Sequence, residues 1–204
     1  MNDADRTRPL RADARESIAR ILDAAQEVYA GDPNASLDRV AQVAGVARAT
    51  VHRHFSSRQV LLDALVRDQN RRYREALEQA RVTTVPPLVA FYRVVERIFE
   101  LKLARPFVLS ITPGPEEPGS PASDPEIAQS LDLLLRRLHT AGDITVDDTA
   151  WGRRVCLALL HEAHELPAGS PALSAPGSTA PDDVGARVDL VVRSVIGALG
   201  GDSR

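Results

Sequence analysis

The chain of 204 residues is poor in several residue types, and their scarcity excludes whole classes of protein. It has a single cysteine, Cys156, so no disulfide framework can form, which suits a reducing compartment. Aromatic residues make up only 4% of the chain. No apolar run approaches the about 20 residues that a membrane span needs, so we expect no transmembrane helix. The first residues are polar and mixed in charge, so we expect no secretory signal peptide. These features predict a cytoplasmic protein that does not cross a membrane.

Strand alternation is also missing, whereas helical periodicity runs through nearly the whole chain. The pattern predicts an all-α fold of about nine helices. We expect these over about 15–29, 36–44, 48–55, 57–80, from 86 onward, 125–139, 147–165 and 182–199, with one helical turn inside the proline-rich loop 105–125. Residues 1–12 are expected to be disordered, and 167–181, rich in Pro, Ala, Ser and Gly, to be a flexible linker. The layout predicts a small N-terminal head over 12–60 and a larger helical body over 61–204.

Acidic residues are absent between Arg39 and Leu62, although the stretch holds four arginines and two histidines. The chain as a whole carries a net charge of −3. A local basic stripe on an otherwise acidic protein is typical of a module that touches nucleic acid.

Within this stripe, residues 36–58 predict two short helices around a turn at Ala44-Gly45-Val46. Ser36 can cap the first helix, and Gly45 permits the positive φ of a tight turn. A small shared core is expected from Leu37, Val40, Ala41, Val46, Val51 and Phe55. The residues left outside are Arg48, Ala49, Thr50, His52 and Arg53. Such a helix fits the major groove, where Arg can bond bidentately to guanine, while helix N-termini and Arg58 can hold phosphates.

The order of these residues resembles the DNA-binding head of the tetracycline-repressor (TetR) family. The matching elements, within about residues 12–65, are Val40-Ala41, Ala44-Gly45-Val46, Thr50-Val51, His54-Phe55 and Ser57-Arg58. The resemblance implies an all-helical homodimer whose first three helices bind double-stranded operator DNA. It also implies that the middle helices enclose a pocket for a small-molecule effector and that the last two helices pair with those of the partner copy.

The resemblance also implies roles by position. Arg48, Thr50 and Arg53 stand where base edges and the nearby backbone are contacted. His52 replaces the usual Tyr and Arg58 the usual Lys, both at phosphate-contacting positions. Ala47 replaces the Ser or Thr that usually caps the recognition helix, and losing that cap costs about 1 kcal/mol.

The last helix is strongly apolar along one stripe. Its apolar residues repeat at 4-3-4-4 spacing, at Val184, Val188, Val191, Val195 and Leu199. A terminal helix of this kind needs cover on two sides, so we predict that the stripe forms a dimer interface. A central core helix in a monomer is the alternative.

Five aromatic residues of the body are candidates for the effector pocket, with a core role the alternative for each: Phe91, Tyr92, Phe99, Phe107 and Trp151. Few charges fall on the inward faces of the surrounding helices, so an apolar or mildly polar effector is expected.

Nothing in the sequence points to catalysis. His161 and His164 stand three residues apart, not the four of the metalloprotease motif, so that signature fails; a two-His site on one helix face is the alternative, but no metal site is expected. Since no Gly-rich phosphate loop, Ser-His-Asp arrangement or carboxylate pair stands out, no cofactor is expected either. The leading prediction is a ligand-responsive transcriptional regulator, released from its operator by a small molecule. The alternatives are an all-helical enzyme or a protein-interaction module in which the basic segment is incidental. The position of the acid-free stripe on the motif favours DNA binding.

Overall fold

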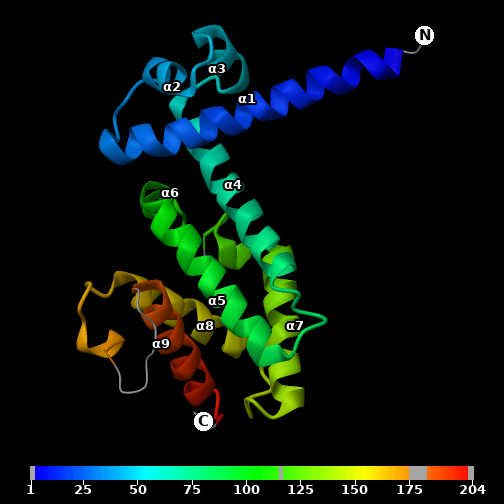
Figure 1. Ribbon diagram of the computed structural model, residues 1–204, viewed down its shortest axis with the longest axis vertical. Helices are drawn as coiled ribbons and strands as arrows, with labels where there is room; N and C mark the ends of the chain where they lie inside the picture. The colour runs from blue at the N-terminus through cyan, green and yellow to red at the C-terminus, as the bar shows by residue number, and fades with distance from the viewer. Residues whose placement is uncertain (1–2, 115–116, 175–182, 202–204) are drawn as a thin grey trace. The chain divides into compact units, whose positions relative to one another are not determined.

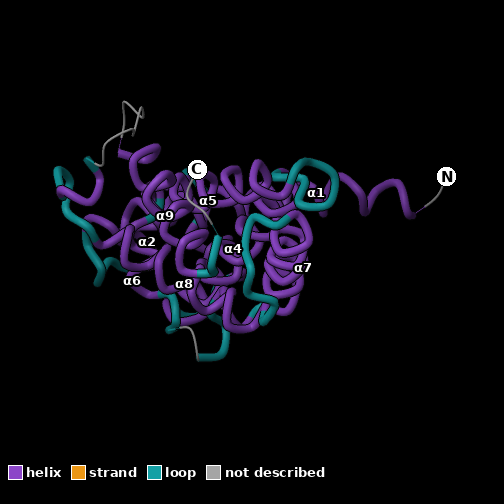
Figure 2. Tube along the Cα trace, turned by 90° about the horizontal axis from the view of Figure 1, so that it is seen from below, coloured by secondary structure: helices purple, strands orange, loops and turns teal. Residues whose placement is uncertain are grey.

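The computed structural model describes residues 3–114, 117–174 and 183–201, with the side chains of 3–14 and 183 left out. Within these residues every regular element is helical, as the ribbon and the trace show (Figures 1 and 2), so the predicted all-α class is confirmed. The α-helices are α1 (Asp3–Gly31), α2 (Leu37–Ala44), α3 (Arg48–His54), α4 (Arg58–Gln79), α5 (Pro87–Ala104), α6 (Pro106–Ile111), α7 (Pro125–Ala141), α8 (Thr149–Glu165) and α9 (Asp183–Ala198), and two short 3-10 turns are η1 (Pro121–Ser123) and η2 (Pro171–Leu173).

Two segments differ from the sequence expectations. Helix α1 already begins at Asp3, so the expected disorder is wrong for residues 3–12. Five of the ten residues from 3 to 12 are Ala or Arg, which favour a helix without needing an apolar stripe. In the predicted linker 167–181, Pro171–Leu173 forms η2 with Leu173 buried, whereas residues 175–182 lie outside the described part of the chain.

The chain divides into two compact units. The first comprises Met1–Gln69 and Arg105–Thr112, and the second Asn70–Ala104 and Pro113–Arg204. The chain therefore passes from one unit to the other three times, once inside α4 and once on each side of α6. Each unit has an apolar core of its own.

A buried ion pair ties three segments of the first unit together. Arg105 and Asp68 are 5% and 7% exposed, and the Arg105 guanidinium donates to the Asp68 carboxylate at 2.8 Å. The same guanidinium lies 3.4 Å from a carboxylate oxygen of Asp23 on α1. Separating the partners of a buried pair leaves an uncompensated buried charge, which is strongly destabilising. The contact therefore holds the 105–112 segment against α1 and α4.

A buried arginine satisfies backbone carbonyls in the second unit. Arg187 of α9 is 4% exposed and donates to the carbonyls of Ala163, His164 and Leu166 at the end of α8. The last carbonyls of a helix have no partner within the helix, so Arg187 supplies one from the neighbouring helix.

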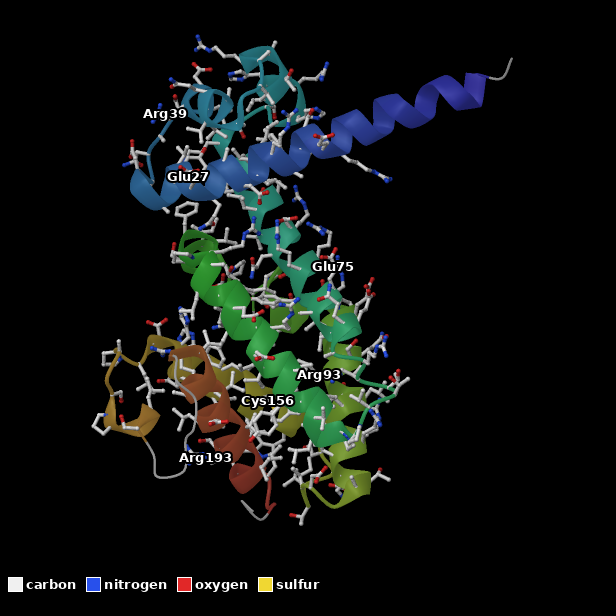
Figure 3. All side chains as sticks on the ribbon, viewed as in Figure 1. Glu27, Arg39, Glu75, Arg93, Cys156 and Arg193 are labelled. Atoms are coloured by element: carbon white, nitrogen blue, oxygen red, sulfur yellow. The ribbon has the colours of Figure 1, made fainter. Side chains whose placement is uncertain are left out.

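Figure 3 shows Cys156 on α8 in this unit, where burial raises the pKa of its thiol to about 12.

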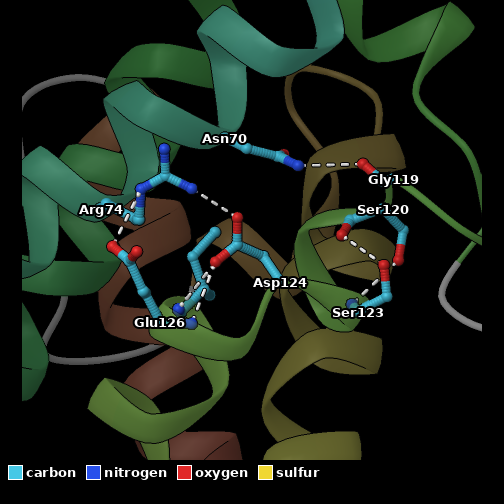
Figure 4. A network of polar contacts seen from close by, with 8 residues as sticks. Asn70, Arg74, Gly119, Ser120, Ser123, Asp124 and Glu126 are labelled. Atoms are coloured by element: carbon cyan, nitrogen blue, oxygen red, sulfur yellow. Dashed lines mark hydrogen bonds and ion pairs between the residues drawn. The ribbon is translucent and has the colours of Figure 1, made fainter.

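Polar contacts hold the proline-rich loop to the part of α4 that belongs to the second unit (Figure 4). Asn70 donates to the carbonyl of Gly119 at 2.9 Å, and Arg74 pairs with Asp124 at 2.5 Å. Asp124 in turn caps α7 by accepting from the amides of Glu126 and Ile127 at 3.1 and 3.2 Å. One side chain thus both starts α7 and fastens it to α4.

Close packing just after the C-terminal end of α9 leaves no room for side chains on Gly200 and Gly201. Gly200 has a φ of +80°, and the amide of Gly201 donates to the carbonyl of Ile196 at 2.9 Å. The amides of Thr145 and Val146 donate to the carbonyl of Leu199 at 3.0 and 3.2 Å, which fastens the α7–α8 loop to α9. A β carbon on Gly201 would collide with the carbonyl oxygen of Asp143.

Replacing Gly201 by Ala should therefore lower the free energy of unfolding by about 1–3 kcal/mol, the usual cost of overpacking. The matched control is Gly31→Ala, because a β carbon there meets no atom within 4 Å. Unfolding in urea, extrapolated to water, measures both variants. Equal stability of the two variants would contradict the close packing at Gly201.

Candidate nucleic-acid interface

The α2–α3 pair forms around a left-handed turn. Ser36 caps α2 by accepting from the amide of Arg39 at 3.3 Å, and Gly45 ends the helix with φ +64° and ψ +34°. The amide of Val46 then donates to the carbonyl of Ala41 at 3.1 Å. Because this backbone conformation costs glycine little, the chain can turn from α2 into α3 within three residues.

The predicted division of α3 into an inner and an outer side is confirmed. Val51 is fully buried, Phe55 is 5% exposed, and Val40 and Ala41 of α2 are buried with them. Arg48, Ala49, His52 and Arg53 are exposed, and Thr50 is half-buried. Ala47 makes no side-chain cap, as its residue type predicts. The structure therefore presents one side of a short basic helix to solvent.

Asp38, in the first turn of α2, contacts two of the candidate DNA-binding residues. Its carboxylate pairs through Oδ2 with the Arg48 guanidinium and lies through Oδ1 3.4 Å from Nε2 of His52. In the sequence alone, an acid at this place indicates only the start of a helix, where the helix dipole favours a negative charge. Since Asp38 stands fourteen positions before His52, local periodicity carries no signal for the contact.

Arg58, expected as an exposed phosphate contact, is exposed but also bound within the head. Its NH2 group donates to the carbonyl of Pro33 at 2.5 Å, and its guanidinium carbon lies 5.1 Å from the centre of the Tyr29 ring. Burial raises the pKa of Tyr29, and the Arg58 cation partly opposes that rise. Arg58 thus links α4 to α1 and the loop after it.

The hydroxyls at the starts of α2 and α4 are occupied by their own helices. Ser36 accepts from Arg39, and Ser57 accepts from the amide of Val60 at 3.3 Å. Neighbouring His54 packs beside Phe55, with ring centres 6.3 Å apart. These contacts hold the starts of α2 and α4 and the end of α3 in place.

The five candidate pocket aromatics do not come together. Phe91 and Phe99 lie in the core of the second unit, at 3% and 0% exposed. Tyr92 and Trp151 are 37% and 53% exposed, and Phe107 belongs to the core of the first unit, where its ring centre lies 5.3 Å from that of Tyr29.

The predicted dimer stripe on α9 is mostly covered by its own chain. Four of its five residues are at most 6% exposed: Val188, Val191, Val195 and Leu199. The fifth, Val184, is half-buried. The core of the second unit therefore already covers most of the stripe that sequence reasoning assigned to a partner copy.

Two hollows of the second unit are small. One of about 280 Å³ is lined by polar side chains of α4 and α5, including Arg93, Glu96 and Arg97. The other, of about 170 Å³, is an apolar groove between α8 and α9, lined by Leu159, Ala163, Leu166, Leu190, Val191 and Ser194 together with Glu162.

Among the described residues, no group of three or more His, Cys, Asp or Glu side chains could hold a metal ion. No described helix has the length and apolar content to span a bilayer.

Comparison with known proteins decides what this head belongs to. Residues 21–65 match the model of the bacterial regulatory proteins of the tetR family. The chain is 37% identical over 158 residues to the HTH-type transcriptional repressor LfrR of Mycolicibacterium smegmatis, which covers 74% of this chain and 80% of LfrR. The chain belongs to the TetR family. The crystal structure of LfrR from Mycobacterium smegmatis in complex with proflavine has a TM-score of 0.60 and 32% identity, covering 88% of this chain and 95% of that one.

A further relative matches a shorter stretch of the chain. The uncharacterized HTH-type transcriptional regulator TtgW of Pseudomonas putida is 44% identical over 57 residues, which span 27% of this chain and 42% of TtgW. The TetR family consists of transcriptional regulators, so this chain is a DNA-binding regulator and the alternative of an all-helical enzyme is set aside. TetR regulators bind operator DNA and respond to small molecules.

Proposed function

We propose that this chain is a cytoplasmic repressor that binds a two-fold operator as a dimer, with α3 of each copy in the major groove. A small molecule that binds in the second unit releases the dimer from the operator. The main support for this is the outer side of α3. Arg48, His52 and Arg53 are exposed there, inside a stretch from Arg39 to Leu62 without an acidic residue. Such a surface attracts the phosphate backbone and offers Arg to guanine.

Arg53 and Arg58 contact different parts of the DNA in this proposal. Arg53 is exposed on the last turn of α3 and reads base edges together with Arg48, Ala49 and Thr50. Arg58 begins α4 while it also contacts Pro33 and Tyr29, so its charge is held at one place, where it meets a phosphate. His52 and the N-terminus of α2 at Ser36 complete the phosphate contacts.

Arg53→Ala should cost about 1–3 kcal/mol on the preferred operator and flatten base preference at one or two positions in each half-site. Arg58→Ala should weaken binding to all duplexes about equally and reduce the salt slope by about one unit per lost contact, hence about two per dimer. Binding constants for the operator selected from a random duplex pool, and for a scrambled duplex, are measured at several salt concentrations.

The control is Arg58→Lys, which keeps the charge and should keep most of the salt slope. Melting temperatures are recorded in parallel because Arg58→Ala also removes the contacts with Tyr29 and Pro33, whereas Arg53→Ala removes an exposed side chain. Full base preference in Arg53→Ala would contradict the assignment of Arg53 to base reading and the placement of α3 that this assignment rests on.

The proposed dimer uses the side of α8 and α9 that their own core leaves open. Trp151, Val155 and Leu159 stand four residues apart on α8, so they share a face, and Trp151 is 53% exposed. Leu159 and Leu190 line the apolar groove between α8 and α9. A second copy of the same pair would cover this face and complete a four-helix interface, as the TetR fold implies.

Leu159→Glu should convert a dimer of about 44 kDa, twice the chain mass of 22.1 kDa, into a monomer at micromolar concentration. Related by the two-fold axis, the introduced carboxylates would be desolvated without partners. Light scattering measures the mass. Val89→Glu on α5, where the valine is 42% exposed, is the matched control and should stay dimeric. A monomeric wild type would remove the basis for a two-fold operator.

The proposed effector is an aromatic, mildly polar molecule that binds among the apolar helices of the second unit. LfrR has been crystallised with proflavine, and the core of this unit is built mostly from aliphatic residues and buried Phe91 and Phe99. The two hollows described above fall below the about 300–1,000 Å³ of usual ligand pockets. The effector therefore makes room for itself by moving helices of the second unit apart. The chain crosses between the units three times, and these crossings transmit the movement to the first unit.

Proflavine is the probe for this proposal. Added at about 100 times its dissociation constant to protein without DNA, it should stabilise the fold by about 2.7 kcal/mol, and it should then release the operator. Arg53→Ala is the control and should bind proflavine as the wild type does, because Arg53 lies in the first unit. Absence of stabilisation, or its loss in Arg53→Ala, would count against an effector of this class in the second unit.

A further inference from the structure

The carboxylate of Asp38 stands between two residues assigned to DNA binding. Arg48 and His52 are four residues apart on α3 and so lie on the same face of the helix. Asp38, presented from α2, contacts Arg48 through Oδ2 and His52 through Oδ1, the latter at 3.4 Å. Both oxygens of one acid are therefore directed at the proposed DNA-contacting surface.

Holding the head together does not explain this arrangement. The side chains of Arg48, His52 and Asp38 are 72%, 53% and 35% exposed. Ion pairs this exposed contribute little to stability. The first unit has a separate apolar core and the buried pair of Arg105 and Asp68 for that purpose.

The contact instead limits what the Arg48 side chain can do. A guanidinium carries five N–H donors in a fixed fork, and Asp38 engages it through one nitrogen. The contact thus holds the remaining N–H donors of Arg48 in one direction. This matters because Arg48 is the first residue of α3, and Ala47 before it provides no side-chain cap to hold the helix start. At the same time the carboxylate offsets the charge that would draw Arg48 to a phosphate and itself repels phosphates.

We propose that Asp38 is a positioning residue that sets sequence specificity: it orients Arg48 for base acceptors and weakens the sequence-independent hold of Arg48 and His52 on the DNA backbone. This inference rests on the proposed function of α3. Specificity is a difference between two affinities, and an acid that penalises the wrong complex raises it as effectively as a new contact with the right one.

The test compares Asp38→Asn with Asp63→Asn in the full chain. Both variants lose one negative charge in the first unit, but Asp63 is exposed on α4 and accepts from Gln59 at 2.8 Å. Binding to the selected operator and to a scrambled duplex of equal length is measured over a range of salt concentrations, and melting temperatures are recorded.

Asp38→Asn should bind the scrambled duplex more tightly and lower the ratio of operator to scrambled affinity about tenfold, the scale of one well-oriented Arg–guanine contact. Its salt slope should steepen by about one unit per subunit, because a freed Arg48 neutralises a phosphate. The melting temperature should move by no more than about 4 °C. Asp63→Asn should keep the wild-type ratio.

A double-mutant cycle with Arg48→Ala separates positioning from a general charge effect. If Asp38 acts through Arg48, adding Asp38→Asn to Arg48→Ala should change the affinity ratio much less than Asp38→Asn does alone. An unchanged ratio in Asp38→Asn, or an equal change in Asp63→Asn, overturns the role of Asp38 while leaving the function of α3 intact. A wild type that prefers no duplex would overturn the function of α3 as well.

Discussion

The left-handed turn at Gly45 is the constraint on which the DNA-binding surface depends. Its φ of +64° lets α2 end and α3 begin within three residues, with the amide of Val46 bonded back to Ala41. The turn thereby sets the angle at which Val51 enters the core shared with Val40. With Val51 inside, Arg48 and His52 must emerge on the side that faces Asp38. A side chain at position 45 would be strained, and the whole face would shift with it.

Charge in the head is arranged by contact as much as by composition. The acid-free stretch between Arg39 and Leu62 looks uniformly basic as a sequence, yet Asp38 just before it reaches Arg48 and His52. Arg58 is likewise held between Tyr29 and Pro33. Arginines held in this way lose less conformational entropy when they meet DNA, and their direction is set before the encounter.

Arginine serves a second purpose in the interior of both units. Arg105 pairs with Asp68 in the first unit, and Arg187 donates to three carbonyls at the end of α8 in the second. Arg137 of α7 similarly donates to the carbonyls of Val82 and Val85. Carbonyls at the end of α8, and those of Val82 and Val85 in the loop between α4 and α5, thus find a donor on a neighbouring helix. A chain whose basic residues are almost all arginine suits this role, since the guanidinium can meet several acceptors at once.

The sequence alone determined the helical class, the boundaries of most helices, the Ser36 cap, the Gly45 turn and the inward side of α3. Each of these follows from residues within about four positions of one another, the range of a helical turn and its caps. Only the tertiary structure decided that Asp38 meets Arg48 and His52, that Arg58 lies over Tyr29, and that Phe107 joins the core of the first unit. It also decided that the apolar stripe of α9, from Val188 to Leu199, is covered by its own chain. These contacts join residues 10 to about 80 positions apart, and their partners are chosen by how helices cross, which no local pattern records.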